Sequence, residues 1–245
     1  MELFLTILSG VAWTIVYAEG IRLGFSDRTY AIPLAALGLN FAWEWVYGIN
    51  GLFGPITAQA VINLIWALAD VVIVYTFFRF GRAEFPTLTT SLFVGWGLLV
   101  IGVSFAVQLL LIGEFGVNDA ARYSAFLQNL LMSGLFIAML IARGGLRGQS
   151  LVIAVAKWIG TLAPTILFGA LHRSALILGL GLMCSVLDLI YIGLILLTMR
   201  STFGTADADA DLTPSHRTFL RTKPHTGRPR PHHSPMVRRN SAQSG

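Results

Sequence analysis

Residues 91–112 read SLFVGWGLLVIGVSFAVQLLLI, and no side chain in this stretch is charged. About 20 apolar residues are enough for a helix to cross the hydrocarbon core of a bilayer. Lipid offers no hydrogen bonds to the backbone, and the apolar character here does not alternate as it would in a half-buried strand. The stretch therefore predicts a membrane-spanning helix.

Six further segments have the same character, which predicts an all-α, polytopic integral membrane protein with seven transmembrane helices in one bundle. In chain order the seven segments are about 2–21, 31–49, 57–79, 91–112, 122–142, 150–170 and 174–198. Turn and charge signals separate them, such as 116–119 (GVND) and 143–145 (RGG). Pro164 predicts a kink in the sixth segment.

The composition agrees with this prediction. Hydrophobic residues make up 55% of the 245 residues, charged residues only 12%, and the mean hydropathy is +0.71. A soluble domain carries roughly 25% charged residues, so a soluble globular protein is excluded. The single cysteine excludes an internal disulfide and any cysteine-based zinc or iron–sulfur cluster.

The basic character of the chain is concentrated in its C-terminal tail. Residues 1–200 hold 10 Lys and Arg against 9 Asp and Glu, whereas residues 201–245 hold 7 against 3. The tail also holds five of the nine prolines, and its low apolar content predicts disorder. It either rests on anionic lipid headgroups or is simply solvated, and no nucleic-acid partner is expected.

The loops predict the orientation in the membrane. Basic residues gather in the loops that follow the first, third and fifth segments, at Arg22, Arg28, Arg79, Arg82, Arg143 and Arg147. Arg200 and the basic tail fall on the same side of the membrane. The positive-inside rule therefore places the C-terminus in the cytosol and the N-terminus outside.

Charged side chains inside spans are costly and are functional hypotheses by default. The candidates are four acids and one base: Glu19, Glu44, Asp70, Asp188 and Lys157. Glu19 lies near the end of its span and can pair with Arg22 one turn further on, which is typical of an interfacial charge.

Glu44 lies in the stretch NFAWEWVYG, residues 40–48. Asn40 and Tyr47 share its helical face, and Trp43 lies beside Tyr47. Apolar surroundings favour the protonated form of a carboxyl, so this face could deliver a proton to an apolar substrate. A structural carboxyl, hydrogen-bonded to a neighbouring helix, explains the pattern equally well.

Asp188 lies in the middle of the last segment with Tyr191 on its face and no Lys or Arg near it in sequence, which favours a functional role. Asp70 shares a face with Trp66. It either lines the same cavity as Glu44 or forms an ion pair with Lys157, and the sequence leaves both interpretations open.

No metal or other cofactor is expected. The chain has no glycine-rich phosphate loop, HExxH or GxSxG motif, and His172 is the single histidine outside the tail. Seven spans with buried acids also suit a proton-coupled small-molecule or lipid transporter. The lack of an internal repeat weakens that alternative.

The sequence resembles the small seven-helix integral-membrane terpene cyclases of fungal meroterpenoid and indole-diterpene pathways, which have bacterial relatives. The resemblance covers about residues 10–200 and rests on four motifs in family order: Asp27-Arg28-Thr29-Tyr30 with Asn40-Phe41-Ala42-Trp43-Glu44 and Val46-Tyr47-Gly48; Tyr75-Thr76 with Phe80-Gly81; Arg143-Gly144 with Arg147-Gly148 and Ser150; and Asp188 with Tyr191. It implies metal-independent cyclisation of a prenyl chain, begun by protonation of a terminal epoxide or alkene. Two acids are essential in that family, and they correspond to Glu44 and Asp188.

The resemblance and the buried residues together predict a membrane cyclase domain over residues 1–200, with Glu44 and Asp188 as its acid/base pair. The predicted substrate contacts are Asn40, Trp43, Tyr47, Trp66, Asp70 and Tyr191. Among them, the aromatic rings of Trp43, Tyr47 and Trp66 would stabilise a carbocation. The expected substrate is a prenylated small molecule from the lipid phase. An upstream prenyltransferase and epoxidase are further expected partners, besides the membrane lipids.

Overall fold

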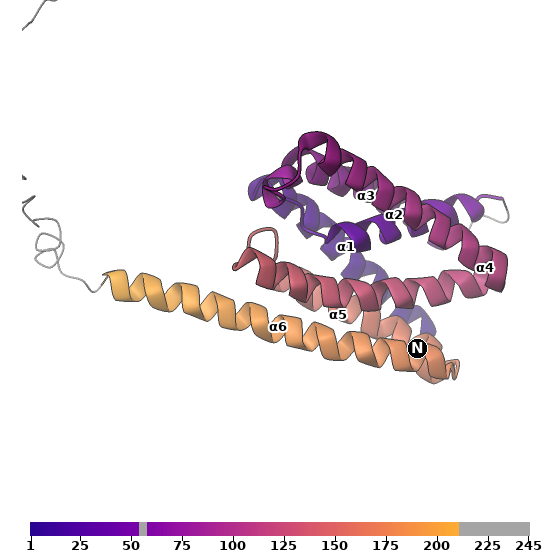
Figure 1. Ribbon diagram of the computed structural model, residues 1–245. Helices are drawn as coiled ribbons and strands as arrows, with labels where there is room; N and C mark the ends of the chain where they lie inside the picture. The colour runs from indigo at the N-terminus through magenta and orange to yellow at the C-terminus, as the bar shows by residue number, and fades with distance from the viewer. Residues whose placement is uncertain (54–57, 211–245) are drawn as a thin grey trace, which may run out of the picture. The chain divides into compact units, whose positions relative to one another are not determined.

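The computed structural model describes residues 1–53 and 58–210 of the chain (Figure 1). The chain divides into two compact units, Met1–Thr202 and Phe203–Gly245. The first unit contains the predicted site residues. The elements of the described residues are α1 (Glu2–Ser26), α2 (Leu34–Asn50), α3 (Ala58–Phe80), the 3₁₀ helix η1 (Gly81–Glu84), α4 (Thr90–Arg143), α5 (Leu151–Pro164), the π-helix η2 (Thr165–Leu171) and α6 (Ala175–Ala210). No strand occurs in these residues, and the all-α prediction is confirmed.

Helix α4 is two antiparallel arms rather than one rod. Its 54 residues would extend about 80 Å if straight, but Gly116 has non-helical angles, φ 75° and ψ 163°. Gln108 and Gln128 lie 20 positions apart, which is about 30 Å along a straight helix, yet their side chains are joined by a 3.1 Å hydrogen bond. The chain therefore reverses at Gly116, as Figure 1 shows, between the predicted segments 91–112 and 122–142.

The predicted count of seven spans is not confirmed. Within the described residues, five helices are long and apolar enough to cross a membrane: Glu2–Ser26, Gln59–Glu84, Thr90–Arg143, Leu151–Leu171 and Ala175–Ser201. The long α4 contains two of the predicted spans, and α2 has only 17 residues. Helix α6 continues to Ala210, and the rest of the predicted tail lies outside the described residues.

The helix type changes at Pro164, where the sequence predicts a kink. Proline has no N–H to give to the preceding turn, so a regular helix cannot continue through it unchanged. Helix α5 ends at Pro164, and the wider π-helix η2 carries the chain on to Leu171.

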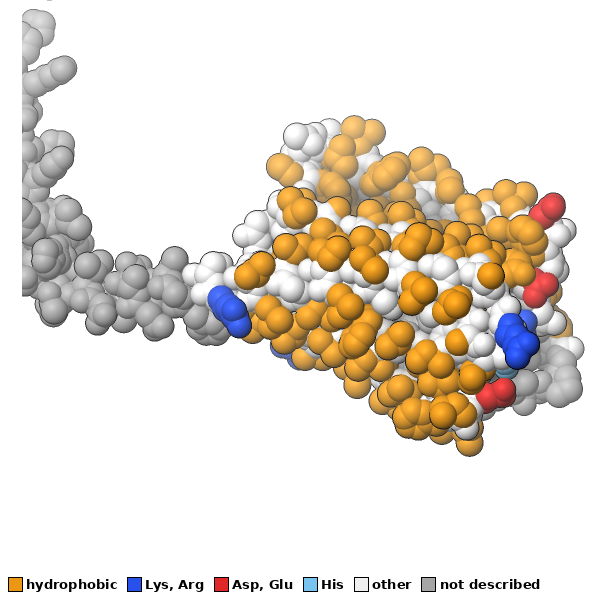
Figure 2. Space-filling view, turned by 90° about the horizontal axis from the view of Figure 1, so that it is seen from below, with side chains coloured by type: hydrophobic (Ala, Val, Ile, Leu, Met, Phe, Trp, Pro, Cys, Tyr) orange, Lys and Arg blue, Asp and Glu red, His pale blue; other side chains and the backbone are white. Residues whose placement is uncertain are grey.

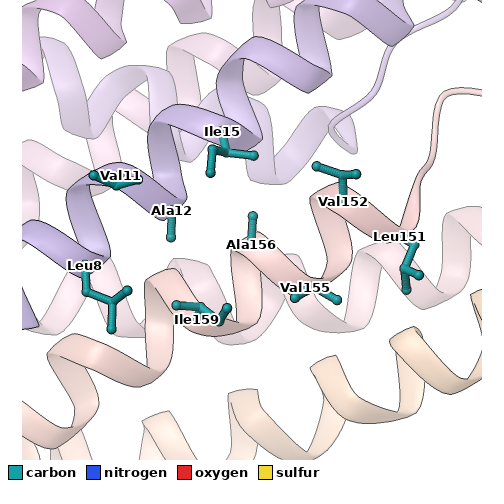
Figure 3. A pocket seen from close by; sticks show the side chains of 9 residues that line it. All are labelled: Leu8, Val11, Ala12, Ile15, Leu151, Val152, Val155, Ala156 and Ile159. Carbon is teal, nitrogen blue, oxygen red and sulfur yellow. The ribbon is translucent and has the colours of Figure 1, made fainter.

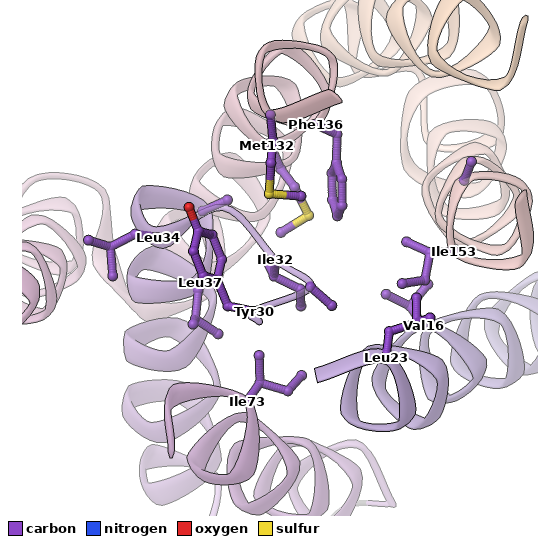
Figure 4. Close-up of a cluster of buried hydrophobic side chains, with 14 of the residues drawn as sticks. Val16, Leu23, Tyr30, Ile32, Leu34, Leu37, Ile73, Met132, Phe136 and Ile153 are labelled. Atoms are coloured by element: carbon purple, nitrogen blue, oxygen red, sulfur yellow. The ribbon is translucent and has the colours of Figure 1, made fainter. Parts of the chain in front are cut away.

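The surface and the core are both apolar, as expected of a protein that lies in lipid. Large hydrophobic side chains cover the face seen in Figure 2, whereas the charged groups lie near helix ends. Inside, α1 packs on α3 and α5, and α2 packs on α3 and α4. Val16, Leu37, Ile73, Phe136 and Ile153 belong to the buried cluster where these helices meet (Figure 4).

Arg143 joins two loops that carry motif residues, the loop at residues 27–30 and the loop at residues 144–148. Its guanidinium donates hydrogen bonds to the Thr29 hydroxyl at 3.1 Å and to the carbonyls of Tyr30 at 3.0 Å and Arg147 at 2.8 Å. The same group lies 4.5 Å from the centre of the Tyr30 ring. Burial raises the pKa of the Tyr30 phenol, against the opposing effect of Arg143, so the phenol stays neutral.

Glu84 of η1 brings a third loop into this contact. Its carboxylate accepts a 2.7 Å hydrogen bond from Thr29 and forms a 3.0 Å ion pair with Arg147. Gly148 donates its N–H to the Asp27 carboxylate at 2.7 Å. Its φ is 68°, and a Cβ atom added at this position would lie only 2.6 Å from the Thr29 methyl group. A side chain at position 148 would therefore push the two loops apart, which explains the glycine.

Candidate active site

Four polar side chains from three helices meet inside the bundle, and we call them the acid cluster: Tyr17 of α1, Asn40 and Glu44 of α2, and Asp70 of α3. Asn40 donates from Nδ2 to the Tyr17 hydroxyl and to Asp70 Oδ2, the latter at 2.9 Å. The Tyr17 hydroxyl donates to Glu44 Oε1 at 3.4 Å. Glu44 is 3% exposed and Asp70 is 0% exposed, so both carboxyls are shielded from solvent.

The spacing of the sequence explains this meeting point. Asn40 and Glu44 are one helical turn apart, so they lie on the same face of α2, as predicted. The structure thus brings Asn40, Glu44 and Asp70 together.

Each carboxyl of the acid cluster retains one oxygen without a hydrogen-bond partner among the described residues. These oxygens are Glu44 Oε2 and Asp70 Oδ1, and the buried hydroxyl of Tyr47 is in the same state. Buried polar atoms in folded proteins are normally paired. The unpaired oxygen of each carboxyl is therefore available to interact with a bound molecule.

The acid cluster continues into α4 through two amides. Gln128 donates to Asn40 Oδ1 at 3.5 Å, and Gln108 donates to Gln128 Oε1 at 3.1 Å. Every donor in this series of hydrogen bonds is uncharged. The same hydrogen bonds hold the Asn40 side chain in place, because both N–H groups and the oxygen of its amide are engaged.

One aromatic ring packs on the acid cluster, and a second aromatic pair lies on α2, which supplies Glu44. The Trp66 ring stacks on the Tyr17 ring with a centroid distance of 5.7 Å, and the Trp43 and Tyr47 rings lie 5.1 Å apart. Trp43 is held by a 3.0 Å hydrogen bond from its Nε1 to the carbonyl of Ala121. Ring faces attract cations strongly when water is excluded.

Asp188 lies in a separate group, the lysine cluster, with Ser133 of α4 and Lys157 of α5. The Lys157 ammonium donates to Asp188 at 2.7 and 3.1 Å and to Ser133 at 2.6 Å. Lys157 is 0% exposed and Asp188 is 1% exposed. The ion pair is therefore fully buried, and all three ammonium protons are used.

The lysine cluster corrects two sequence-based interpretations. Asp188 has no basic neighbour in sequence, but the fold supplies Lys157 from α5, so this aspartate is not alone. Of the two interpretations left open for Asp70, the ion pair with Lys157 is wrong, since Lys157 bonds Asp188 and Asp70 bonds Asn40. The expected Glu19–Arg22 pair is present at 2.6 Å.

Tyr191 is turned toward the loop end of the bundle. Its hydroxyl donates to Gln149 Oε1 at 2.9 Å, and its ring lies 5.3 Å from that of Phe136. Among the described residues, no hydrogen bond joins Asp188 or Tyr191 to the acid cluster. The predicted site residues therefore fall into two groups.

A groove between α1 and α5 is apolar and is lined by none of these groups. It has a volume of about 440 Å³ between α1 and α5 and is lined by Leu8, Val11, Ala12, Ile15, Leu151, Val152, Val155, Ala156 and Ile159 (Figure 3). No side chain in it can give or accept a proton. The groove itself therefore offers no proton donor.

Sequence reasoning missed Tyr17, Ser133 and the two glutamines. Gln108 and Gln128 carried a usable signal, since an amide in an apolar span needs a partner. Tyr17 and Ser133 carried little signal, because tyrosine and serine are common in membrane helices and only the packing shows what they bond.

The chain was compared with known proteins. Residues 1–200 match the family described as Pyr4-like transmembrane terpene cyclases. The chain is 31% identical to the Pyr4-family terpene cyclase mfmH of Annulohypoxylon moriforme, over 67% of this chain and 68% of that protein. It is 29% identical to the terpene cyclase pyr4 of Aspergillus fumigatus, over 75% and 80%. It is also 29% identical to the asnovolin H synthase nvfL of Aspergillus novofumigatus, over 64% and 65%.

An all-helical membrane protein with buried carboxyls in its bundle is thus the class that fold and site define. The chain belongs to the Pyr4-like transmembrane terpene cyclase family. The predicted resemblance and the terpene cyclase class are confirmed. Comparison with solved structures gave no match.

Proposed function

We propose that this terpene cyclase folds and closes the prenyl chain of a meroterpenoid or prenylated indole by proton addition, without a metal ion, with Glu44 and Asp188 as its acid and base. The observation that carries the proposal is the Glu44 carboxyl, which is buried and has a free Oε2. A carboxyl in such surroundings keeps its proton and can hand it to an apolar molecule.

The proton goes from Glu44 to the terminal alkene carbon or the epoxide oxygen of the substrate. Breaking the alkene π bond or the epoxide C–O bond leaves a carbocation, which the next double bonds attack to form rings. Loss of a proton from the carbon beside the last cation makes a new double bond. One proton enters and one leaves, so the product is an isomer of the substrate.

Aromatic rings support this route. Trp43, Tyr47 and Trp66 can stabilise the migrating cation by cation–π attraction, worth about 2 kcal/mol each when water is excluded. Exclusion of water also protects the cation from being quenched.

Asp188 is the second acid of the proposal. Its ion pair with Lys157 supports an anionic role, as the final proton acceptor or as a fixed negative charge near the cation. The proton donor is then Glu44, whose carboxyl has no cationic partner among the described residues.

The family implies a prenylated, lipophilic substrate, which partitions into lipid and reaches the bundle laterally. One relative is named for asnovolin H, which supports a meroterpenoid substrate here. A prenyltransferase, and an epoxidase where the substrate carries an epoxide, would supply that molecule.

The test uses membranes that contain the full chain. Wild type, Glu44→Gln and Asp188→Asn each receive farnesylated and geranylgeranylated aromatic acceptors, with and without a terminal epoxide. Chromatography with mass spectrometry should show an isomer of unchanged mass with wild type only, provided that each variant inserts in the membrane. Undiminished product with both variants contradicts the proposal. Uptake of an unaltered substrate into sealed vesicles would instead support the transporter alternative.

A further inference from the structure

The hydroxyl of Tyr17 connects Glu44 to the rest of the acid cluster. Tyr17 is 3% exposed, and its oxygen lies 3.4 Å from Glu44 Oε1 and within hydrogen-bond distance of Asn40 Nδ2. Among the described residues, no other side chain forms a hydrogen bond with the Glu44 carboxyl. The way in which Tyr17 is held therefore decides how this carboxyl is oriented.

The ring of Tyr17 is fixed by a tryptophan from the neighbouring helix α3. It stacks on the Trp66 ring with a centroid distance of 5.7 Å and an interplanar angle of 25°. The Trp66 indole N–H donates to Thr14 Oγ1 at 3.2 Å, and Thr14 lies about one turn before Tyr17 on α1. Trp66 is thus held by α1 while it packs on the tyrosine, so the Tyr17 hydroxyl reaches the acid cluster from a fixed direction.

The hydrogen bonds of Asn40 set the direction of the Tyr17 O–H group. One N–H of the Asn40 amide donates to Asp70 Oδ2 at 2.9 Å, and its oxygen accepts from Gln128 Nε2 at 3.5 Å. The second N–H therefore donates to the Tyr17 oxygen. A tyrosine oxygen that accepts from an amide keeps its own hydrogen to donate, and among the described residues its acceptor is Glu44 Oε1.

This direction distinguishes the two oxygens of a protonated Glu44. In a neutral carboxyl, one oxygen is a carbonyl acceptor and the other carries the proton. Oε1 accepts from Tyr17, so it is the carbonyl oxygen. Oε2 has no hydrogen-bond partner among the described residues, so the proton that it carries is free to be given to a substrate.

We propose that Tyr17 is a positioning residue for the proton donor: its hydroxyl, directed by Asn40, holds Oε1 of Glu44 and leaves the transferable proton on Oε2. This inference rests on the proposed function of Glu44 as the acid. When Glu44 gives up its proton, the carboxyl becomes negatively charged, and the hydrogen bond from Tyr17 becomes charge-assisted and stronger. Tyr17 therefore stabilises the transition state more than the ground state, which raises kcat.

The first readout is infrared spectroscopy of the purified full chain. The carbonyl stretch of protonated Glu44 is the band that wild type shows and Glu44→Gln lacks. Tyr17→Phe removes the hydroxyl but keeps the ring on Trp66. A hydrogen bond lowers the stretching frequency of the carbonyl that accepts it, so the Glu44 band should move to a higher frequency in Tyr17→Phe.

Turnover supplies the second readout. Loss of a hydrogen bond to a developing charge should lower kcat about ten- to a hundredfold in Tyr17→Phe. KM should change little, because the hydroxyl acts through Glu44 and not on the substrate. Tyr123→Phe is the matched control, since it removes a tyrosine hydroxyl from a ring that packs on Phe115, and it should change neither the Glu44 band nor kcat.

The positioning role of Tyr17 and the donor role of Glu44 fail in different ways. A Glu44 band that does not move in folded Tyr17→Phe, or a wild-type kcat in that variant, overturns the positioning role. If Tyr17→Phe does not fold, a wild-type Glu44 band at the frequency of a carboxyl without hydrogen bonds overturns it, and a lower frequency supports it. Undiminished cyclisation by Glu44→Gln overturns Glu44 as the donor, while a shifted band would still show its hydrogen bond to Tyr17.

Discussion

The acid cluster and the lysine cluster hold the buried acids of this cyclase in opposite electrostatic states. In the lysine cluster, Asp188 faces an ammonium whose three protons are all engaged. In the acid cluster, Glu44 and Asp70 receive only neutral hydrogen bonds, and each keeps an unpaired oxygen. Burial alone therefore does not define what a carboxyl does in a membrane.

The difference separates a proton donor from an anion. A carboxylate paired with an ammonium stays ionised and gives up that state only to a strong acid such as a carbocation, whereas an uncompensated carboxyl in apolar surroundings holds its proton until an acceptor arrives. The two clusters can thus supply an acid and an anion within one bundle, which is the combination that the proposed cyclisation uses.

Removing the cation from the lysine cluster should cause the largest loss of stability. Lys157→Met leaves Asp188 buried without a counter-charge, and breaking such a pair costs about 3–5 kcal/mol. Thermal unfolding of the protein in detergent measures the loss. The double variant Lys157→Met/Asp188→Asn should recover most of it, and an unchanged unfolding temperature in the single variant would show that the pair is not formed.

The aromatic side of the acid cluster predicts a smaller effect on turnover. Trp66→Leu removes the ring that stacks on Tyr17, and the loss of one cation–π contact of about 2 kcal/mol should slow cyclisation about thirtyfold. Initial rates in membranes measure this change. Trp45→Leu is the matched control, because the Trp45 ring packs on Phe41 and not on the acid cluster; equal rates for both variants would remove Trp66 from the site.

The amide chain predicts the smallest effect. Gln128→Leu breaks the links to Gln108 and Asn40, and a hydrogen bond between membrane helices contributes about 0.6 kcal/mol on average, with a maximum near 1.7. Denaturant titration in detergent should show a loss of this size. Asn129→Leu, one position on, alters an amide whose oxygen has no partner among the described residues. An equal loss of unfolding free energy in this variant would show that the hydrogen bonds of Gln128 do not contribute to stability.

Much of the fold was predictable because the membrane restricts a chain so strongly. An uncharged run such as 91–112 can only be a helix in lipid, and a glycine followed by Asn118 and Asp119 is where such a chain turns. The reversal of α4 at Gly116 lies in that break. The count of spans was not predictable to the same degree, since hydropathy does not measure how far each helix crosses.

The candidate site also has a part that the sequence could predict and a part that it could not. Asn40 and Glu44 were predictable partners because helical spacing alone aligns them. Lys157 and Asp188 lie 31 positions apart on different helices, so no local pattern could show that they pair. The sequence left the pairing of Lys157 with Asp70 open for the same reason, because charge balance identifies possible partners but not how the helices pack.

The most direct test compares binding and turnover in Glu44→Gln. Membranes with wild type or Glu44→Gln would receive one substrate that wild type converts, and both retained substrate and cyclised product would be measured over a single turnover. The variant should retain substrate as wild type does while conversion falls by roughly 10²–10⁴-fold, the usual contribution of a general acid. Conversion at the wild-type rate by Glu44→Gln would contradict the assignment of Glu44 as the proton donor.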